Sequence, residues 1–264
     1  MPQPHAPSYT AGMSDLLSVN RDGHVTLVRM TRTDKHNAFN RALSAEVLAA
    51  LNDLEAGDAV HAVVLTGSDA AFCAGADMTE AVAAIDENGR NDGMAAAIVR
   101  VARFPKPLLA CVNGAAYGGG ALLAITCDIR IASERAAFRF PGAAYGLVVG
   151  GSQLPRIVGA AFAKELLFTG RVVQAEEALR IGLVNHVLPH ADAEAATMEM
   201  AQQVAANSPA ALLGTKQAVD RATEVDDGIR VEAEWNAGLR ASPEHHARFR
   251  AAQERVARRG GDPQ

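Results

Sequence analysis

The stretch that decides the fold is Asn113–Ser133, NGAAYGGGALLAITCDIRIAS. The apolar run Leu108–Val112 just before it predicts a buried strand that ends where a glycine-rich loop begins. Ala121–Ile125 then predicts the start of a helix, and Ile129–Ala132 predicts the next strand. Strand, helix and strand in this order are the unit of an α/β fold.

Upstream of this stretch, Leu16–Asn20 and Val25–Met30 predict a hairpin, Leu43–Leu54 a helix and Val60–Leu65 a buried strand. The small residues of 71–78 predict a loop. From Ala160 to residue 258 the pattern is almost entirely helical. We therefore expect an α/β protein with a disordered tail at 1–12, a β/α core at 13–200 and a helical C-terminal region at 201–264.

Composition restricts the class of protein. Apolar residues make up 49% of the 264 residues and charged residues 21%, which excludes disorder of the whole chain. With 25 Lys and Arg against 30 Asp and Glu, the net charge is -5 and no basic run predicts a nucleic-acid partner. No apolar run approaches the roughly 20 residues of a membrane span, and residues 1–12 lack the features of a targeting peptide.

The cysteines and the missing motifs exclude further chemistry. Cys73, Cys111 and Cys127 are widely spaced, which indicates buried thiols in a reducing compartment rather than disulfides or a metal site. We therefore expect a cytoplasmic protein and no metal. GxGxxG, GxxxxGK[ST], HExxH and GxSxG do not occur, so redox, phosphoryl-transfer, zinc and nucleophile-elbow chemistry have no support. His186 and His190 are separated by Pro189 and do not predict a metal pair.

Two glycine-containing loops each follow a predicted strand. They are AFCAGADM at 71–78 and VNGAAYGGGA at 112–121. Small residues let a ligand approach the backbone, and a helix that starts after Gly119 points unpaired N–H groups outward. Either loop alone is most simply a tight turn. Two such loops that meet at one point would form an oxyanion hole for an acyl oxygen.

At this point the sequence resembles the crotonase (enoyl-CoA hydratase/isomerase) superfamily. The two loops match the family's two oxyanion segments. Further matches follow in family order from about Asp15 to Arg258: KHNA at 35–38, FPKP at 104–107, ELLFTGR at 165–171, ALRIGLVNHV at 178–187 and SP at 208–209. Each piece alone is short, but the ordered set is specific for this family.

The resemblance implies a crotonase-like spiral of ββα units with a helical C-terminal trimerisation region, assembled as a homotrimer or a dimer of trimers. It also implies that the protein binds an acyl-CoA thioester, with coenzyme A entering as part of the substrate and no other cofactor. Ala76 and Gly119 would donate the two backbone N–H groups to the thioester oxygen.

The same resemblance assigns the walls of the site by position. The CoA arm would pass His36, Ala38 and Ala74, and the acyl pocket would be lined by Asp77, Met78, Tyr117, Leu122, Pro141 and Gly142. Family members also contact CoA phosphates through basic residues near the C-terminus. Arg255 is the candidate here, although a solvated surface arginine is the simpler interpretation.

The chain departs from the hydratase pattern at both acid–base positions. Hydratases of the family carry a glutamate three residues after the second donor and another after the following proline, where this chain has Leu122 and Gly142. Each such group contributes typically about 10²- to 10⁴-fold, so hydration should be greatly slowed. Candidates for a replacement acid or base are Tyr145 first, then Tyr117, Glu80 and Asp77.

Three hypotheses remain at this stage. The first is an enoyl-CoA hydratase/isomerase-like lyase with non-standard acid–base chemistry, or a variant such as decarboxylation of a malonyl-type thioester. The second is a non-catalytic acyl-CoA-binding protein, which Leu122 and Gly142 favour. The third is a serine hydrolase, for which Ser152 has no evident partner. Arg139 would meet a substrate carboxylate or simply lie at a strand surface.

Overall fold

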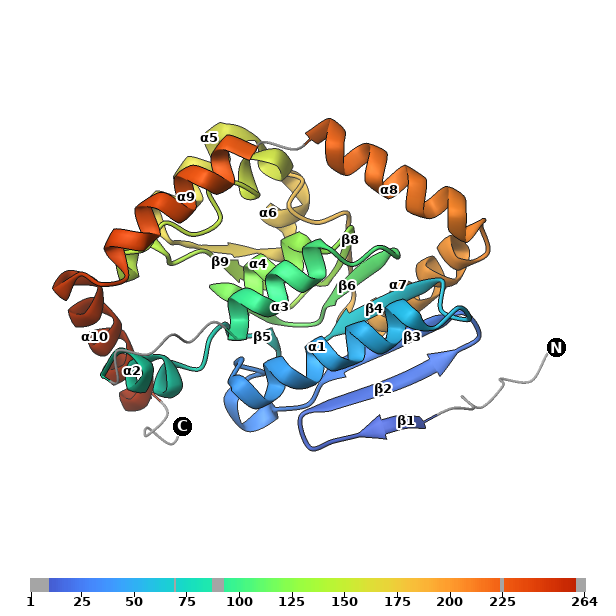
Figure 1. Cartoon of the computed structure of the whole chain (residues 1–264), viewed down its shortest axis with the longest axis horizontal. Helices are drawn as coiled ribbons and strands as arrows, with labels where there is room; N and C mark the ends of the chain where they lie inside the picture. The colour runs from blue at the N-terminus through green and yellow to red at the C-terminus, as the bar shows by residue number, and fades with distance from the viewer. Residues whose placement is uncertain (1–9, 69, 87–92, 224–225, 260–264) are drawn as a thin grey trace.

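The computed structural model describes residues 10–68, 70–86, 93–223 and 226–259. Two β-sheets form its centre (Figure 1). The larger sheet has the order β1-β2-β3-β4-β6-β8-β11, with strands Thr10–Met13, Leu17–Asp22, Val25–Met30, Ala62–Thr66, Leu108–Val112, Ile129–Ser133 and His186–Leu188. The smaller has the order β10-β9-β7-β5, with strands Val172–Gln174, Ala137–Arg139, Ala115–Tyr117 and Ala71–Cys73.

The chain moves between the two sheets as a spiral. β4 and β5, then β6 and β7, then β8 and β9 each place one strand in the large sheet and the next in the small sheet. Each pair is followed by helix: α2 (Met78–Asp86) and α3 (Gly93–Ala102), α4 (Gly119–Thr126), and α5 (Leu154–Thr169). From β3 onward the large-sheet pairs are parallel. This confirms the predicted α/β spiral of ββα units.

The core fills both sides of the large sheet. All five residues of β4 and of β6 are buried, which explains their continuous apolar runs, because central parallel strands face protein on both sides. On one face α1 (Arg41–Ala56), α3 and α4 contribute to the main apolar cluster. On the other face α7 (His190–Ala205) packs Ala193, Ala201 and Ala205 against the sheet.

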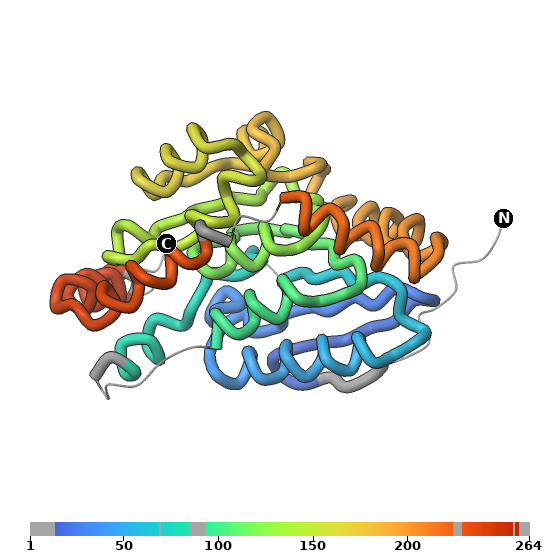
Figure 2. Tube along the Cα trace, turned by 45° about the horizontal axis from the view of Figure 1, so that its top comes forward, coloured from blue at the N-terminus to red at the C-terminus, as the bar shows by residue number. Residues whose placement is uncertain are grey.

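The C-terminal helices leave this core. α6 (Ala175–Arg180) and α7 stay on the sheets, whereas α8 (Pro209–Thr223), α9 (Asp226–Leu239) and α10 (Pro243–Arg259) run around the outside (Figures 1 and 2). The predicted boundary at residue 200 therefore lies inside α7, and the helices that extend beyond the sheets begin at Pro209. None of the helices within the described ranges combines the length and apolar character of a membrane span.

The structure differs from the sequence predictions at three places. Residues 10–12, predicted as part of a disordered tail, pair with β2 in strand β1. The predicted loop 71–78 contains β5 and the first residue of α2. The helix predicted from Ala160 starts at Leu154, with a kink at Gly159 (φ 74°). All three depend on partners distant in sequence, or on a single glycine that breaks a helix, which local patterns do not show.

Candidate active site

The first loop is joined to the segment that follows β3. Short helix η1 (Thr33–Lys35) leads into His36 and Asn37, whose φ angles of 50° and 56° are uncommon for residues other than glycine. The Ala74 N–H donates to the His36 carbonyl at 3.0 Å, and the Phe39 N–H donates to the Gly75 carbonyl at 2.7 Å. The predicted CoA-arm residues His36, Ala38 and Ala74 therefore lie along one continuous backbone surface.

Ala76 lies at the end of this surface with an unused donor. Phe39 and Ala76 form a parallel β-bridge. Its two hydrogen bonds run from the Phe39 N–H to the Gly75 carbonyl at 2.7 Å and from the Asp77 N–H to the Phe39 carbonyl at 2.8 Å. The intervening Ala76 N–H takes no part in it. Within the described ranges this N–H has no hydrogen-bond acceptor in the protein.

Gly119 supplies the second unused donor. It is the first residue of α4, so its N–H has no acceptor within the helix, whereas the Leu122 N–H donates back to Gly118 at 3.1 Å. Gly118 adopts φ 55° and its N–H donates to the Arg139 carbonyl at 2.9 Å, which ties the loop to β9. A methyl group on Gly119 would meet the side chain of Met94 at 2.6 Å, so the packing requires glycine here.

The two loops touch at Gly75. A methyl group at Gly75 would lie 2.8 Å from the Tyr117 carbonyl oxygen and 3.3 Å from the Gly119 nitrogen. Gly75 also has φ 100°, a region that L side chains rarely adopt. Glycine is thus required for both reasons, and its absence of a side chain lets the Ala76 and Gly119 donors approach one another. The Tyr117 carbonyl lies at this contact.

Asp77 serves the local structure. It accepts the Thr79 and Glu80 N–H groups at the start of α2 and pairs with Arg32 at 2.8 Å. Burial alone would raise the pKa of Asp77, but the Arg32 guanidinium and the two N–H groups hold that pKa below its ordinary value. An ionised, fully engaged carboxylate does not act as an acid near neutral pH.

The other acid–base candidates occupy different surroundings. The Glu80 carboxylate accepts the Arg41 N–H at 2.9 Å and so links α2 to α1. Tyr145, in the short helix η2 (Ala143–Tyr145), packs the edge of its ring against Phe249 of α10, with centroids 5.4 Å apart. The Tyr145 carbonyl accepts a hydrogen bond from His245 Nδ1 at 2.6 Å. Arg139 donates through Nε to the Gly170 carbonyl at 2.8 Å, as expected of a strand-surface arginine.

Leu122 and Gly142, the two positions at which the resemblance predicts glutamates in a hydratase, are apolar and closely packed. Leu122 is 8% exposed and belongs to the main core, and a methyl group at Gly150 would lie 3.0 Å from its Cδ2. At Gly142 a methyl group would meet the Val149 side chain at 3.1 Å and the Leu147 carbonyl at 3.2 Å. Pro141 lies near Gly118, 4.0 Å from its missing Cβ position.

Two α9 side chains that the sequence pattern did not identify bind the segment 148–152, shortly after Gly142 in the chain. Glu232 accepts the Gly150 N–H at 3.2 Å and both the N–H and the hydroxyl of Ser152 at 3.3 Å. Asn236, one turn later, accepts the Val148 N–H at 3.0 Å. Their spacing of four residues places Glu232 and Asn236 on one face of a helix. The sequence does not show that this face contacts the segment 148–152, because that segment lies about 80 residues earlier in the chain. Ser152 is engaged by this carboxylate, which gives the serine-hydrolase hypothesis no support.

Three remaining predictions concern Met78, Arg255 and the cysteines. Met78 begins α2, and Arg255 is exposed on α10. Cys73, Cys111 and Cys127 are free and buried. Burial raises the pKa of the Cys73 thiol to about 12 despite the opposing hydrogen bond from Gly75, so it is no nucleophile near neutral pH.

The fold and the two adjoining donor loops define an α/β spiral protein in which two glycine-containing loops carry N–H groups without an acceptor among the described residues. The model of the enoyl-CoA hydratase/isomerase family matches residues 20–259. The chain belongs to this family.

Individual relatives agree with that assignment. A short-chain-enoyl-CoA hydratase of Clostridium acetobutylicum is 37% identical over 224 residues, which cover 82% of this chain and 86% of the relative. A 4-chlorobenzoyl coenzyme A dehalogenase of an Arthrobacter species is 39% identical over 199 residues, 72% of each chain. The solved structure of an enoyl-CoA hydratase/isomerase from Pseudoalteromonas atlantica is 30% identical, with a TM-score of 0.82 over 90% of this chain and 97% of that one.

Proposed function

We propose that this protein binds an acyl-CoA thioester and stabilises the thioester enolate with the backbone N–H groups of Ala76 and Gly119. The observation that carries the proposal is the meeting of these two unused donors at Gly75. Backbone donors aimed at a developing oxyanion are worth about 10²- to 10³-fold each, and they do not depend on the missing glutamates. The proposed substrate brings its own coenzyme A, so the reaction needs no further cofactor.

The proposed enzyme is of the hydratase/isomerase type but uses unusual acid–base groups. Leu122 and Gly142 supply no proton. The dehalogenase relative is named for a reaction other than hydration, which supports a family site that accepts different steps on CoA thioesters. Tyr145 stays our candidate acid or base, with Tyr117 next, because Asp77 and Glu80 are engaged in helix contacts.

A second candidate function is acyl-CoA binding without turnover. Leu122 and Gly142 favour it, because neither residue carries an acid or a base. Decarboxylation of a malonyl-type thioester is the corresponding alternative reaction, since carbon dioxide loss forms the enolate without a protein base.

The deciding experiment is a titration with crotonyl-CoA that follows enoyl-thioester absorbance and binding heat in one sample. Binding with hydration near ordinary enzyme rates supports a replacement acid–base pair. Binding without turnover favours the binding protein, and release of carbon dioxide from malonyl-CoA favours the decarboxylase. Failure to bind any CoA thioester contradicts the site assignment.

The oxyanion hole has its own spectroscopic readout. A thioester carbonyl polarised by two N–H donors absorbs at lower infrared frequency than the same carbonyl in water. With ¹³C-labelled crotonyl-CoA we expect this shift in the wild-type complex and its loss in Gly75→Ala, which pushes the loops apart. A bound thioester with an unshifted carbonyl would contradict the assignment of Ala76 and Gly119.

We further propose that α8 and α9 take part in a trimer or a dimer of trimers. Val219, Val231 and Trp235 are exposed, Trp235 by 62%, and a cavity of about 350 Å³ lies beside Trp235 and Leu239. Apolar side chains gathered on an outer face favour a protein partner. Light scattering should give a mass of three or six chains, reduced by Trp235→Glu and unchanged by Glu234→Gln.

A further inference from the structure

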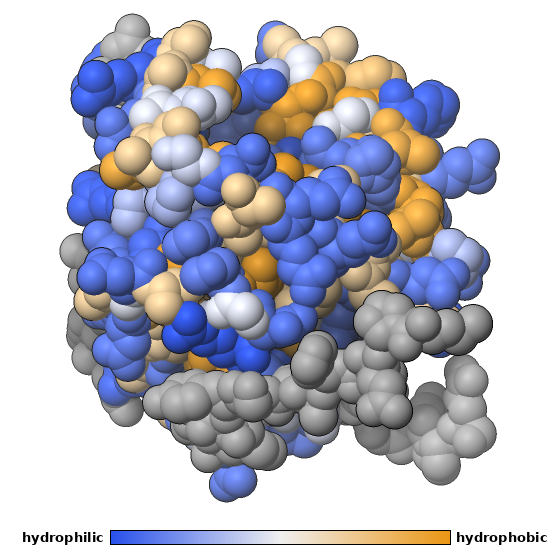
Figure 3. All heavy atoms as spheres, turned by 90° about the vertical axis from the view of Figure 1, so that its right-hand side faces the viewer, coloured by the Kyte–Doolittle hydropathy of each residue, from blue (hydrophilic) through white to orange (hydrophobic). Residues whose placement is uncertain are grey.

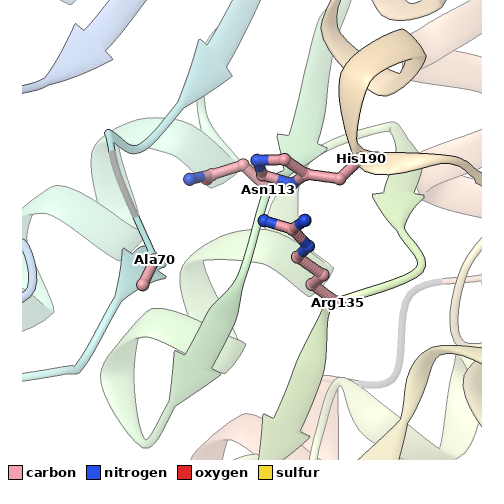
Figure 4. Close-up of a pocket in the computed structure, with 4 residues that line it drawn as sticks. All are labelled: Ala70, Asn113, Arg135 and His190. Carbon is pink, nitrogen blue, oxygen red and sulfur yellow. The ribbon is translucent and has the colours of Figure 1, made fainter.

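A second cavity lies at the opposite end of the small-sheet strands from the oxyanion loops. It is lined by Ala70, Asn113, Arg135 and His190 and has a volume of about 420 Å³ (Figure 4). Ala70 and Asn113 precede β5 and β7, whereas Ala76 and Gly119 follow the same strands. The cavity is therefore distinct from the thioester site. It also lies where the parallel strands β4, β6 and β8 end, and α/β sheets commonly bind ligands at such ends.

His190 is oriented in this cavity by a buried hydroxyl. Ser133, the last residue of β8, is 0% exposed, and its Oγ lies 3.0 Å from His190 Nδ1. The same Oγ accepts the Arg135 N–H at 3.1 Å. Among the described residues Nδ1 is the one acceptor for the Ser133 proton, so the hydroxyl donates to Nδ1 and the imidazole proton resides on Nε2. His190 thus has a donor free on the other side of its ring.

Arg135 supplies a cation to the same space. In Figure 4 its guanidinium extends toward the side chains of His190 and Asn113. Within the part of the chain that the structure describes, this guanidinium has no ion pair and no hydrogen bond. The nearby Glu134 carboxylate accepts the His190 backbone N–H at 3.4 Å instead. Asn113 forms a wall, with its Oδ1 accepting the Gly67 N–H at 3.2 Å and its Nδ2 donating to Ala71 at 3.3 Å.

We propose that this cavity binds the phosphate group of a small phosphorylated molecule, with the Arg135 guanidinium and His190 Nε2–H as its donors. A planar guanidinium fork matches two phosphate oxygens, and charge-assisted bonds of this kind are the strong ones. The volume exceeds what one phosphate needs, so the ligand carries a further small group. Ser133 is a positioning residue, because full burial keeps its hydroxyl from touching the ligand.

The test is calorimetric titration of the full-length protein with inorganic phosphate at low ionic strength. We expect saturable binding with a Kd in the millimolar range or below, a roughly tenfold or greater weakening in Arg135→Gln and in His190→Gln, and a smaller loss in Arg135→Lys. Ser133→Ala should weaken binding several-fold by freeing the imidazole. The matched control is Arg180→Gln, which removes another exposed arginine, 68% accessible, that does not line the cavity. Thermal unfolding of each variant verifies that it folds.

Two outcomes overturn the proposal. One is the absence of phosphate binding by the wild-type protein, and the other is equal binding by Arg135→Gln and the wild type. A crotonyl-CoA titration of Arg135→Gln separates this proposal from the thioester site, because binding there should be unchanged. In a further experiment, competition between crotonyl-CoA and inorganic phosphate would assign the cavity to the CoA phosphates. That result would contradict the proposal that the cavity binds a ligand of its own.

Discussion

The sheet core and the three C-terminal helices of this protein are stabilised in opposite ways. In the core, β4, β6 and α4 bury nearly every side chain, including Leu109 and Leu123 at 0% exposure. In α8 no residue is buried, and Leu213, Val219 and Trp235 of α8 and α9 remain exposed (Figure 3 shows the side that carries α8). The core is held by apolar burial, α8 and α9 by a few polar contacts, and α10 by a polar contact together with buried Phe249 and Ala252.

Those contacts attach each helix at a separate point. Lys216 of α8 pairs with Asp128 at 2.8 Å, and Glu232 and Asn236 of α9 bind the segment 148–152. His245 of α10 binds the Tyr145 carbonyl, and Phe249 packs beside it. The proposed donors therefore belong to the buried part of the molecule, whereas the exposed α9 and α10 contact the segments that follow Gly142. The predictions below test that division.

The largest expected effect comes from glycines in the two regions. Gly75→Ala introduces a methyl group 2.8 Å from a carbonyl oxygen at a φ of 100°, so we expect thioester turnover, or binding where turnover is absent, to fall about 100-fold or more. Gly214→Ala in α8 meets no atom within 4 Å and should stabilise the helix by up to about 1 kcal/mol. Crotonyl-CoA titration and thermal unfolding measure both. Equal thioester binding and equal thermal stability of the two variants would contradict the distinction between the core loops and the outer helices.

Leucines in the two regions should differ in stability. Leu123→Ala empties a fully buried position and should lower the free energy of unfolding by about 2–5 kcal/mol. Leu213→Ala, at a position 38% exposed, should change it by about 0.5 kcal/mol or less in the monomer. Urea unfolding at low protein concentration provides the measurement. A large loss of unfolding free energy in Leu213→Ala would show that Leu213 of α8 is buried against another surface even at low protein concentration.

The α9 attachment should matter locally. Glu232→Gln weakens the charge-assisted bonds to Gly150 and Ser152, and we expect the N–H groups of both residues to exchange hydrogen about tenfold faster, in line with a loss of about 1–2 kcal/mol. Glu234→Gln, whose partner Arg230 lies on the same exposed helix face, is the control and should leave these rates unchanged. Unaltered hydrogen exchange of Gly150 and Ser152 in Glu232→Gln would show that the segment 148–152 keeps its structure without the Glu232 carboxylate.

The smallest effect concerns pH and α10. Burial, opposed by the bond to Tyr145, lowers the pKa of His245 below its ordinary value of about 6.5. The unfolded chain then binds more protons than the folded one, so the contribution of neutral His245 to stability is present above that ordinary value and is lost as pH falls toward the folded-state pKa. Proteolysis of α10 should rise over this window, less so in His245→Gln. A rise of equal size in both would exclude His245 as the cause.

Sequence alone predicted the parts of the fold that depend on local pattern. The continuous apolar runs predicted β4 and β6, and the helical spacing of Leu43–Leu54 predicted α1. Small strands were harder, since β5 and β7 have three residues each and exist through their pairing with one another. The family resemblance carried the positions of Ala76 and Gly119, whose roles stay predictions.

The candidate site divides in the same way. The two loops, and the apolar residues Leu122 and Gly142, are plain from the residues in order. The attachment of Glu232 to Gly150, the ion pair of Arg32 with Asp77 and the pairing of Ser133 with His190 join residues 82, 45 and 57 positions apart. No local pattern encodes such contacts.

What the sequence by itself determined is therefore the family, the order of strands and helices and the chemistry that the backbone offers, because these depend on residue types at short spacing. Only the tertiary structure decided which polar groups are engaged and which are free: Asp77 pairs with Arg32, whereas the N–H groups of Ala76 and Gly119 have no acceptor among the described residues. The physical reason is that a hydrogen-bonding group is defined by its partners, and here those partners come from distant parts of the chain.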